Sequence, residues 1–325
     1  MVLYAGLDIH KEFHNGCIMD EKGVIVKEAR FDNSREYVLA FFAGFDVKRV
    51  VFESTGFWWP LYELLESVGL EVVLAHPFKV KCIAFAKLKN DKVDARMLAH
   101  LLRADLIPES FIPSKEMRAL RQVTRHRANL VRTRVVVKNK IKAYLLREGI
   151  KTKGSYIFSE TGKRFISQKA GAELKSYYSV LNTLDSEIKI YDAKIKAVAR
   201  NRKETSLLLT IPGVGHYSAL LIFAEISNIK RFSSAKKLIS FAGLAPMRQE
   251  SAGKGSAKLS HQCCKIIKGI LTEIVGVAIK YPGRIQRHYY EVQKKKGWRI
   301  ARISTARYML SIMWSMLANM QPYKS

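Results

Sequence analysis

No aspartate follows Asp192 in this chain of 325 residues, and residues 206–325 contain only four acidic side chains, all of them glutamates. Protein sites for Mg²⁺ or Mn²⁺ are built largely from carboxylate and other oxygen ligands. The last third of the chain therefore cannot form a metal cluster based on aspartates. Any such site has to come from the first part of the chain.

Cysteine is scarce as well. The chain has Cys17, Cys82, Cys263 and Cys264 but no Cys-x-x-Cys pair, so neither a disulfide framework nor a cysteine zinc site is indicated. No apolar run reaches 18 residues, as a membrane span requires, and no signal-peptide pattern opens the chain. The composition predicts a protein of the reducing cytoplasm with no membrane partner.

What the chain has in excess is positive charge, at a net +28, and this charge is unevenly distributed. Residues 1–114 carry 14 Lys and Arg against 16 acids, residues 115–205 carry 23 against 8, and residues 206–325 carry 19 against 4. The asymmetry indicates a polyanionic partner for the two later stretches. Pro108 and Pro113 mark the end of the first stretch. The charge distribution and these prolines together predict three domains, at 1–112, 113–205 and 206–325.

The first of these stretches has the pattern of an α/β domain. Helical patterns lie between the third and fourth predicted strands, between the fourth and fifth, and after the fifth. This order of elements favours a mixed five-stranded sheet with helices packed on it. The five predicted strands lie at residues 2–9, 13–19, 24–29, 49–53 and 72–75.

Four carboxylates in this domain are candidate metal ligands. Asp8 and Glu53 each lie near the end of a predicted buried strand, where an unpaired charge is costly. Asp91 and Asp94 open the last helix and share one face of it, although a capped, solvated helix start would have the same pattern. Four carboxylates at one sheet edge would repel one another unless Mg²⁺ or Mn²⁺ held them together. Two such ions suit phosphoryl transfer.

This arrangement resembles the ribonuclease H-like fold of the RuvC type and, more narrowly, the DEDD transposases of bacterial insertion sequences, also described as bridge-RNA-guided recombinases. The resemblance implies that Asp8, Glu53, Asp91 and Asp94 are catalytic metal ligands. It also implies double-stranded donor and target DNA as substrates and a guide RNA as a partner. The matching segments are Gly6-Leu7-Asp8, Phe52-Glu53-Ser54-Thr55-Gly56 and Asn90-Asp91-Lys92-Val93-Asp94-Ala95-Arg96.

The middle stretch begins with residues 115–147, which hold eleven Lys and Arg and a single acid, Glu116. Apolar residues recur at helical spacings there and again over 181–200, which predicts a helical coiled-coil arm. A solvated basic helix is the alternative, but the scarcity of acids favours contact with phosphates. In the family that the chain resembles, such an arm serves dimerisation and nucleic-acid contact, which implies a homo-oligomer: a dimer, or a tetramer in synapsis. The predicted phosphate contacts are Arg118, Arg121, Arg125, Arg132 and Lys138.

The last stretch predicts a mainly helical domain. The segment Pro212-Gly213-Val214-Gly215 precedes an apolar helix and is typical of a helix-hairpin-helix-like element, in which backbone N–H groups at Gly213 and Gly215 bind a phosphate. A plain loop between helices has the same pattern. Further helices are predicted over 234–243 and 261–320. Additional predicted phosphate contacts on the later helices are Lys294, Lys295 and Arg299.

A loop of small residues is predicted from Met247 to Ser256. A serine in such a loop, taken alone, is typical of a flexible turn. However, Phe241-Ala242-Gly243-Leu244-Ala245-Pro246, with a serine five residues after the proline, is similar to the second signature of the DEDD transposases, where the serine is the nucleophile. The resemblance assigns this role to Ser251. Arg248 and Lys254 beside it are predicted nucleic-acid contacts that could stabilise the charge on the phosphate. Because Ala252 stands where the family often has glycine, Ser256 is the second candidate.

Together these signals predict a DNA transposase or site-specific recombinase. In this hypothesis Ser251 attacks a DNA phosphodiester to give a phosphoserine intermediate, and the four carboxylates hold Mg²⁺. Two alternatives stay open: a Holliday-junction-type, structure-selective nuclease that uses metal-activated water, and a nucleic-acid-binding protein without chemistry. A kinase of the actin-like fold is disfavoured because no second glycine-rich phosphate loop follows the first strand.

Overall fold

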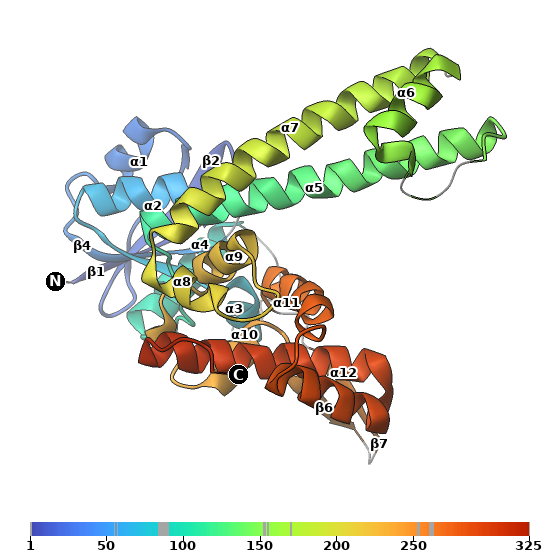
Figure 1. Ribbon diagram of the computed structural model, residues 1–325. Coiled ribbons are helices and arrows are strands. Elements are labelled where there is room, and N and C mark those ends of the chain that lie inside the picture. Colours follow the sequence, from blue (N-terminus) through green and yellow to red (C-terminus); the bar gives the residue numbers. More distant parts are fainter. Residues whose placement is uncertain are drawn as a thin grey trace. The chain divides into compact units, whose positions relative to one another are not determined.

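The computed structural model describes residues 2–54, 56, 58–83, 91–151, 154, 156–169, 171–251, 254–259 and 263–324; the side chains of 91–92, 165–169, 246–251 and 254–259 lie outside its described part. The chain divides into two compact units, Met1–Ile112 and Pro113–Ser325, whose elements are labelled in Figure 1. Each unit has its own hydrophobic core. None of the described helices is long and apolar enough to cross a membrane.

The first unit is an α/β domain on a mixed five-stranded sheet, as predicted, and the strand order is β3-β2-β1-β4-β5. Strand β2 is antiparallel to β1 and β3, whereas β4 is parallel to β1 and β5. The strands are β1 (Leu3–Ile9), β2 (Phe13–Asp20), β3 (Ile25–Asp32), β4 (Val47–Glu53) and β5 (Glu71–Ala75). The helices are α1 (Arg35–Phe42), α2 (Trp58–Ser67), α3 (Pro77–Ile83) and α4 (Asp91–Arg103). The sequence pattern does not predict α3.

Helices pack on both faces of this sheet. Ala5 and Leu7 of β1 belong to a core that includes buried residues of α1 and α2. Because successive side chains of a strand point to opposite faces, Gly6 and Asp8 face the other way. On that second face, Val51 of β4 packs with buried leucines of α4. Helix α4 therefore lies over the face that carries Asp8.

The contact between β1 and α4 requires a glycine at position 6. A Cβ atom at Gly6 would collide with the carbonyl oxygen of Ala95 and would lie 2.5 Å from the backbone nitrogen of Ala99. Both alanines are small and almost fully buried. The helix backbone thus rests directly on the strand, which only the absence of a side chain at Gly6 allows.

Helix α4 runs antiparallel to β1. At its C-terminal end, Arg103 donates a hydrogen bond of 2.9 Å to the carbonyl oxygen of Glu21, in the turn between β2 and β3. That turn lies beside the start of β1, since Leu3 pairs with Asp20. The first turn of α4 is therefore directed toward the carboxyl end of β1.

The second unit is mainly helical, as predicted. Its longest helices before residue 201, α5 and α7, lie side by side (Figure 1) around a shared seam that includes Val137, Ile141 and Leu181. The helices are α5 (Lys115–Arg147), α6 (Glu160–Lys169), α7 (Ala172–Arg200), α8 (Lys203–Leu209), α9 (His216–Ile226), α10 (Ala235–Phe241), α11 (Lys265–Ala278) and α12 (Arg284–Asn319). A β-hairpin, β6 (Pro246–Ser251) and β7 (Lys254–Leu259), follows α10.

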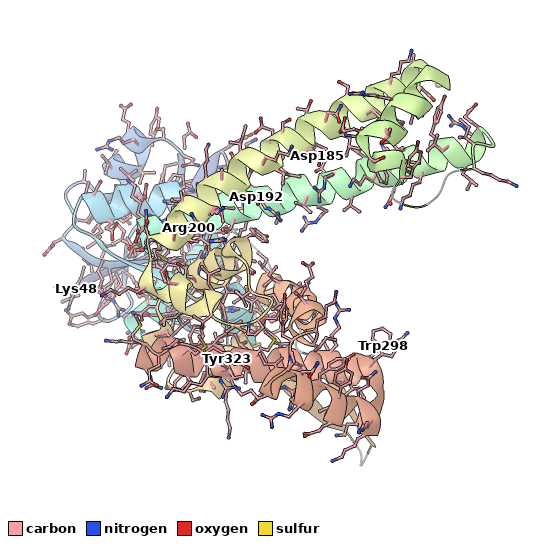
Figure 2. The ribbon with its side chains drawn as sticks, viewed as in Figure 1. Lys48, Asp185, Asp192, Arg200, Trp298 and Tyr323 are labelled. Atoms are coloured by element: carbon pink, nitrogen blue, oxygen red, sulfur yellow. The ribbon has the colours of Figure 1, made fainter. Side chains whose placement is uncertain are left out.

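Two features shape the long helices of this unit. Ion pairs join α5 to α7, from Arg127 to Asp192 at 2.8 Å and from Arg134 to Asp185 at 3.2 Å; both aspartates are labelled on α7 in Figure 2. Helix α12 is broken at Gly297, whose φ of 79° and ψ of 166° are not helical. Glycine adopts positive φ at little cost, which allows this break.

Replacing Gly6 by alanine is expected to destabilise the first unit by about 1–3 kcal/mol, because the added methyl group overpacks the contact with α4. Hydrogen–deuterium exchange of the β1 and α4 amides measures this locally. Gly269→Ala in α11 is the control, since its Cβ would meet no atom within 4 Å, and a helical alanine stabilises by about 0.5–1 kcal/mol relative to glycine. Unchanged protection of β1 in the Gly6→Ala protein would contradict the close contact.

Candidate active site and nucleic-acid interface

Asp8 and Glu53 lie at the carboxyl ends of neighbouring parallel strands. The pairing of β1 with β4 matches Gly6 with Val51 and ends with Leu7 opposite Phe52, so the next residues along both strands are Asp8 and Glu53. Two residues beyond Gly6 and Val51, they share the face over which α4 lies. Both are half-buried. The fold therefore brings these two predicted ligands to one edge of the sheet.

The other two predicted ligands belong to the first turn of α4. Asp94 is half-buried and lies one turn before the buried Leu98, so it is on the side of the helix that faces the sheet. Asp91 is the first residue of α4, and its side chain is outside the described part. Among the described residues, no group of three or more His, Cys, Asp or Glu side chains is placed to hold a metal ion. Metal binding by the four carboxylates stays a prediction.

The donor chemistry at this edge fits a hard divalent cation, since carboxylate oxygens are the ligands that Mg²⁺ and Mn²⁺ prefer. Two neighbours of Asp8 were not predicted. His10 Nε2 lies 3.0 Å from Asp8 Oδ2, which orients this carboxylate. Asn15 of β2, only 5% exposed, is opposite Asp8 in the register. The sequence signal for Asn15 is its polar side chain within a strand that is otherwise mostly buried and apolar.

The candidate nucleophile lies on the β6–β7 hairpin, and here the predicted loop over 247–256 is wrong. Ser251 ends β6 and pairs with Lys254, and Gln249 pairs with Ser256. The small residues thus satisfy their backbone groups by strand pairing. Positions 252–253 and the side chains of Arg248, Ser251, Lys254 and Ser256 lie outside the described part.

Cys264, which follows the hairpin in sequence, belongs to a buried polar network. Glu225, 2% exposed at the end of α9, accepts two hydrogen bonds from Arg125, at 2.7 and 2.9 Å, and one from the Cys264 thiol at 3.7 Å. Burial, and then the charge of Glu225, raise the pKa of Cys264 to about 11, and burial lowers the pKa of Arg231 to about 10. The amide of Cys264 also donates to the carbonyl of Phe241 at 2.8 Å, which ties the chain after the hairpin to α10.

The predicted phosphate contacts on α5 have mixed environments. Arg118 is 7% exposed and donates to the carbonyl of Pro113. Arg121 donates to the backbone carbonyls of Ala224 and Glu225, so it and Arg125 hold α5 to α9. Arg132 is exposed and bonds Asn129, and the Lys138 ammonium lies 4.7 Å from the Phe158 ring centre. Nucleic-acid contact by these side chains stays a prediction, best supported at Arg132.

The loop between α8 and α9 contains the two predicted glycines. Gly213 has φ +86°, and a Cβ there would lie 2.9 Å from the backbone nitrogen of Ala278, so the loop packs closely on α11. The Gly215 amide donates to Ser218 Oγ at 2.9 Å, which caps α9. The Gly215 N–H therefore already has a partner within the protein. Phosphate binding by the backbone at Gly213 and Gly215 stays a prediction.

Helix α12 carries the last predicted contacts. Lys294, Lys295 and Arg299 are exposed around the break at Gly297. Trp298 is 55% exposed and stands away from the ribbon in Figure 2, with the Arg299 guanidinium 5.3 Å from its ring centre. An exposed aromatic among cations is typical of nucleic-acid surfaces.

Comparison with known proteins gives the class of this chain. A transposase family model matches residues 5–149, the part with Asp8, Glu53, Asp91 and Asp94. A model described as the transposase IS116/IS110/IS902 family matches residues 205–291, the part with Ser251. The chain is therefore a transposase, an enzyme class that recombines DNA. It belongs to the IS116/IS110/IS902 family.

Curated relatives agree with this assignment. The chain is 29% identical over 258 residues to the transposase for insertion sequence element IS1111A of Coxiella burnetii, which covers 76% of this chain and 69% of that protein. It is 25% identical over 256 residues to the transposase for insertion sequence element IS1533 of Leptospira borgpetersenii, covering 74% of each chain. The similarity spans both structural units.

Proposed function

We propose that this transposase cuts and rejoins the DNA strands of an insertion sequence through a phosphoserine intermediate. Ser251 is the proposed nucleophile, and Asp8, Glu53, Asp91 and Asp94 are the proposed ligands of Mg²⁺ or Mn²⁺. The observation that carries the proposal is the antiparallel course of α4 along β1. It directs the first turn of α4 to the sheet edge where Asp8 and Glu53 lie.

The proposed reaction exchanges one phosphodiester for another. The Ser251 oxygen attacks a backbone phosphorus, a Ser O–P bond forms, and one P–O bond of the DNA breaks. The serine releases its proton, and the departing DNA oxygen takes one up. Attack by a hydroxyl of a second strand on the phosphoserine reverses these steps and joins the strands. Mg²⁺, when bound, supplies positive charge that stabilises the charge developing on the phosphoryl oxygens.

The residues of the chain prepare this chemistry in two places. In the first unit, His10 orients Asp8 at 3.0 Å, and the N-terminal turn of α4 favours negative charge at Asp91 and Asp94. In the second unit, Lys254 pairs with Ser251 in the hairpin, and a cation there would offset the charge of the phosphate. Both units have to act on the same phosphodiester, so neither is complete alone.

The proposed partners follow from the charge of the second unit. Its two basic stretches are proposed to bind donor and target DNA and a guide RNA, with residues 113–205 as an arm and residues 206–325 as the serine domain. The arm has apolar residues on its surface: Val135 and Val136 of α5 and Ile190 of α7 are each about half exposed. Such residues favour contact with another chain, which supports a homo-oligomer, a dimer or, in synapsis, a tetramer.

Each of the substitutions Asp8→Asn, Glu53→Gln, Asp91→Asn and Asp94→Asn is expected to lower strand cleavage in Mg²⁺ by more than about 100-fold, beyond the effect of changes outside the ligand shell. DNA binding without metal should not weaken, because each change removes a negative charge. Cleavage of labelled DNA and fluorescence anisotropy measure the two effects. The control is Asp105→Asn, a 91% exposed carboxylate at the far end of α4. Full cleavage by the Asp8→Asn protein would refute the metal site.

Serine attack is expected to leave protein covalently joined to DNA. With Mg²⁺, wild-type protein should shift end-labelled DNA to protein size on a denaturing gel, and protease should remove the shift. Ser251→Ala should abolish both the adduct and cleavage, since no other group then forms the O–P bond.

Ser256→Ala is the paired variant, because Ser256 lies on the facing strand of the same hairpin. It should retain the adduct. Loss of the adduct in Ser256→Ala alone would move the nucleophile to Ser256. Free cleaved ends from the Ser251→Ala protein, without any adduct, would instead support a nuclease that uses water.

A further inference from the structure

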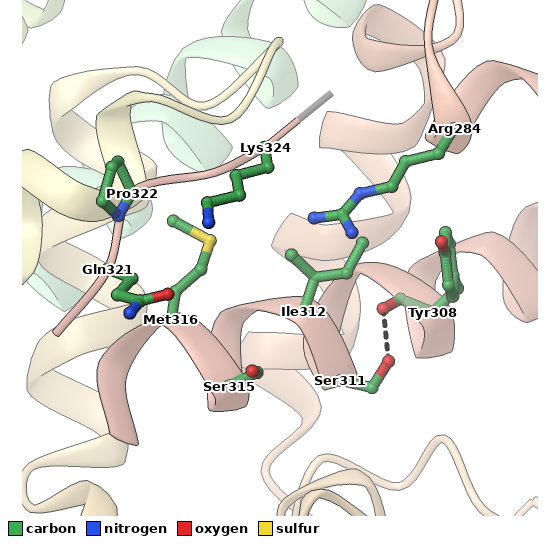
Figure 3. A pocket seen from close by; sticks show the side chains of 9 residues that line it. All are labelled: Arg284, Tyr308, Ser311, Ile312, Ser315, Met316, Gln321, Pro322 and Lys324. Atoms are coloured by element: carbon green, nitrogen blue, oxygen red, sulfur yellow. Dashed lines mark hydrogen bonds between the residues drawn. The ribbon is translucent and has the colours of Figure 1, made fainter. Parts of the chain in front are cut away.

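We propose that a pocket between the start of α12, its last turns and the segment 321–324 binds a backbone phosphate of a nucleic-acid strand. The pocket has a volume of about 340 Å³ and lies within the second unit, remote in sequence from the proposed nucleophile. Two cationic side chains line it, Arg284 from the start of α12 and Lys324 from the segment after α12 (Figure 3). This inference rests on the proposed DNA-handling function and adds a binding site to it.

The pocket exists because the chain folds back after α12. Met320 adopts a left-handed conformation, with φ 51°, and its amide bonds the carbonyl of Met316. This conformation is costly for a residue with a side chain, and it turns residues 321–324 back along the helix. The Tyr323 amide then donates to Thr210 Oγ1 at 2.9 Å, which fixes the segment on the end of α8.

Tyr323 also orients the first of the two cations. The Arg284 guanidinium lies 4.6 Å from the ring centre of Tyr323, within the range of a cation–π contact. Arg284 Nε is buried without a hydrogen-bond partner among the described residues. Because this N–H is closed to solvent, it is also closed to a ligand, and the terminal amino groups of the guanidinium are the donors that a phosphate in the pocket could reach. The planar fork of arginine also suits two phosphate oxygens.

The remaining lining suits a phosphate together with its sugar. None of the described lining residues is acidic, so no carboxylate competes for the two cations. Ser315 supplies a hydroxyl group, whereas the Ser311 hydroxyl donates to the Tyr308 carbonyl at 2.7 Å and can only accept from a ligand (Figure 3). Ile312 and Met316 form an apolar floor. A free inorganic anion would leave that floor exposed to water, whereas a sugar would cover it.

The test compares the salt dependence of binding by pocket variants and charge-matched controls. Arg284→Gln and Lys324→Gln remove the pocket cations. Arg287→Gln, one turn further along α12, and Lys280→Gln remove exposed cations that do not line the pocket. Anisotropy with a duplex DNA and with a single-stranded RNA of equal length, over a range of NaCl concentrations, gives the log–log slope of affinity against salt for each.

Removal of one phosphate-binding cation should reduce the steepness of the slope by about 0.9 on duplex DNA or about 0.7 on a single strand. We expect that reduction for each pocket variant and twice as much for the double variant, on the strand that occupies the pocket. The control variants should keep the wild-type slope, and Arg284→Lys should retain most of it. Thermal melting of every variant shows that it is folded.

Pocket and control slopes that agree on both nucleic acids would overturn the inference. A second result would also overturn it: inorganic phosphate raises the melting temperature of the wild-type protein but not of Arg284→Gln, while the slopes of pocket and control variants stay equal. The pocket would then bind a free anion. The proposed function fails separately, through a shallow slope in the wild-type protein or the absence of Mg²⁺-dependent cleavage.

Discussion

The direct contact of the α4 backbone with β1 at Gly6 is the constraint on which the first unit depends. The helix can lie this close because Gly6 has no side chain and because Ala95 and Ala99 are small. Its direction is fixed at the other end by the bond from Arg103 to the β2–β3 turn. From this one contact follows the position of the first turn of α4 relative to Asp8 and Glu53, and with it the chemistry that we propose for this edge.

The second unit carries most of the positive charge of the chain and still has a packed core. It places one carboxylate, Glu225, where it receives Arg125 and the Cys264 thiol, and the carbonyls around it accept bonds from Arg121 and Arg231. Loss of Arg125 would leave the buried Glu225 carboxylate with less compensating charge, which is destabilising. Arg121 and Arg125 hold α5 to α9, so exposed cations without such bonds are the better candidates for nucleic-acid contact.

Much of this architecture could be predicted from the sequence, because hydrophobic periodicity reports burial. The five strands and the helix over 115–147 follow from such patterns. The hairpin at 246–259 was missed because glycine, serine and lysine have low strand propensity, and pairing between the two strands outweighs it. The pocket at Arg284 could not be predicted from the sequence either, because it forms only when the turn at Met320 brings distant residues together. Arg121 and Arg125 bond residues of α9 that are distant in sequence. Composition does not show these contacts, so it predicted phosphate contacts for both arginines.

We propose that the sheet edge at Asp8 and Glu53, with the first turn of α4, is a divalent-metal site. Anomalous diffraction at the manganese edge, from crystals grown with Mn²⁺, tests it most directly. We expect a peak about 2.0–2.2 Å from carboxylate oxygens of both Asp8 and Glu53, near the distances usual for small divalent cations. Ordered Mn²⁺ elsewhere in the protein, with no peak at this edge, would contradict it.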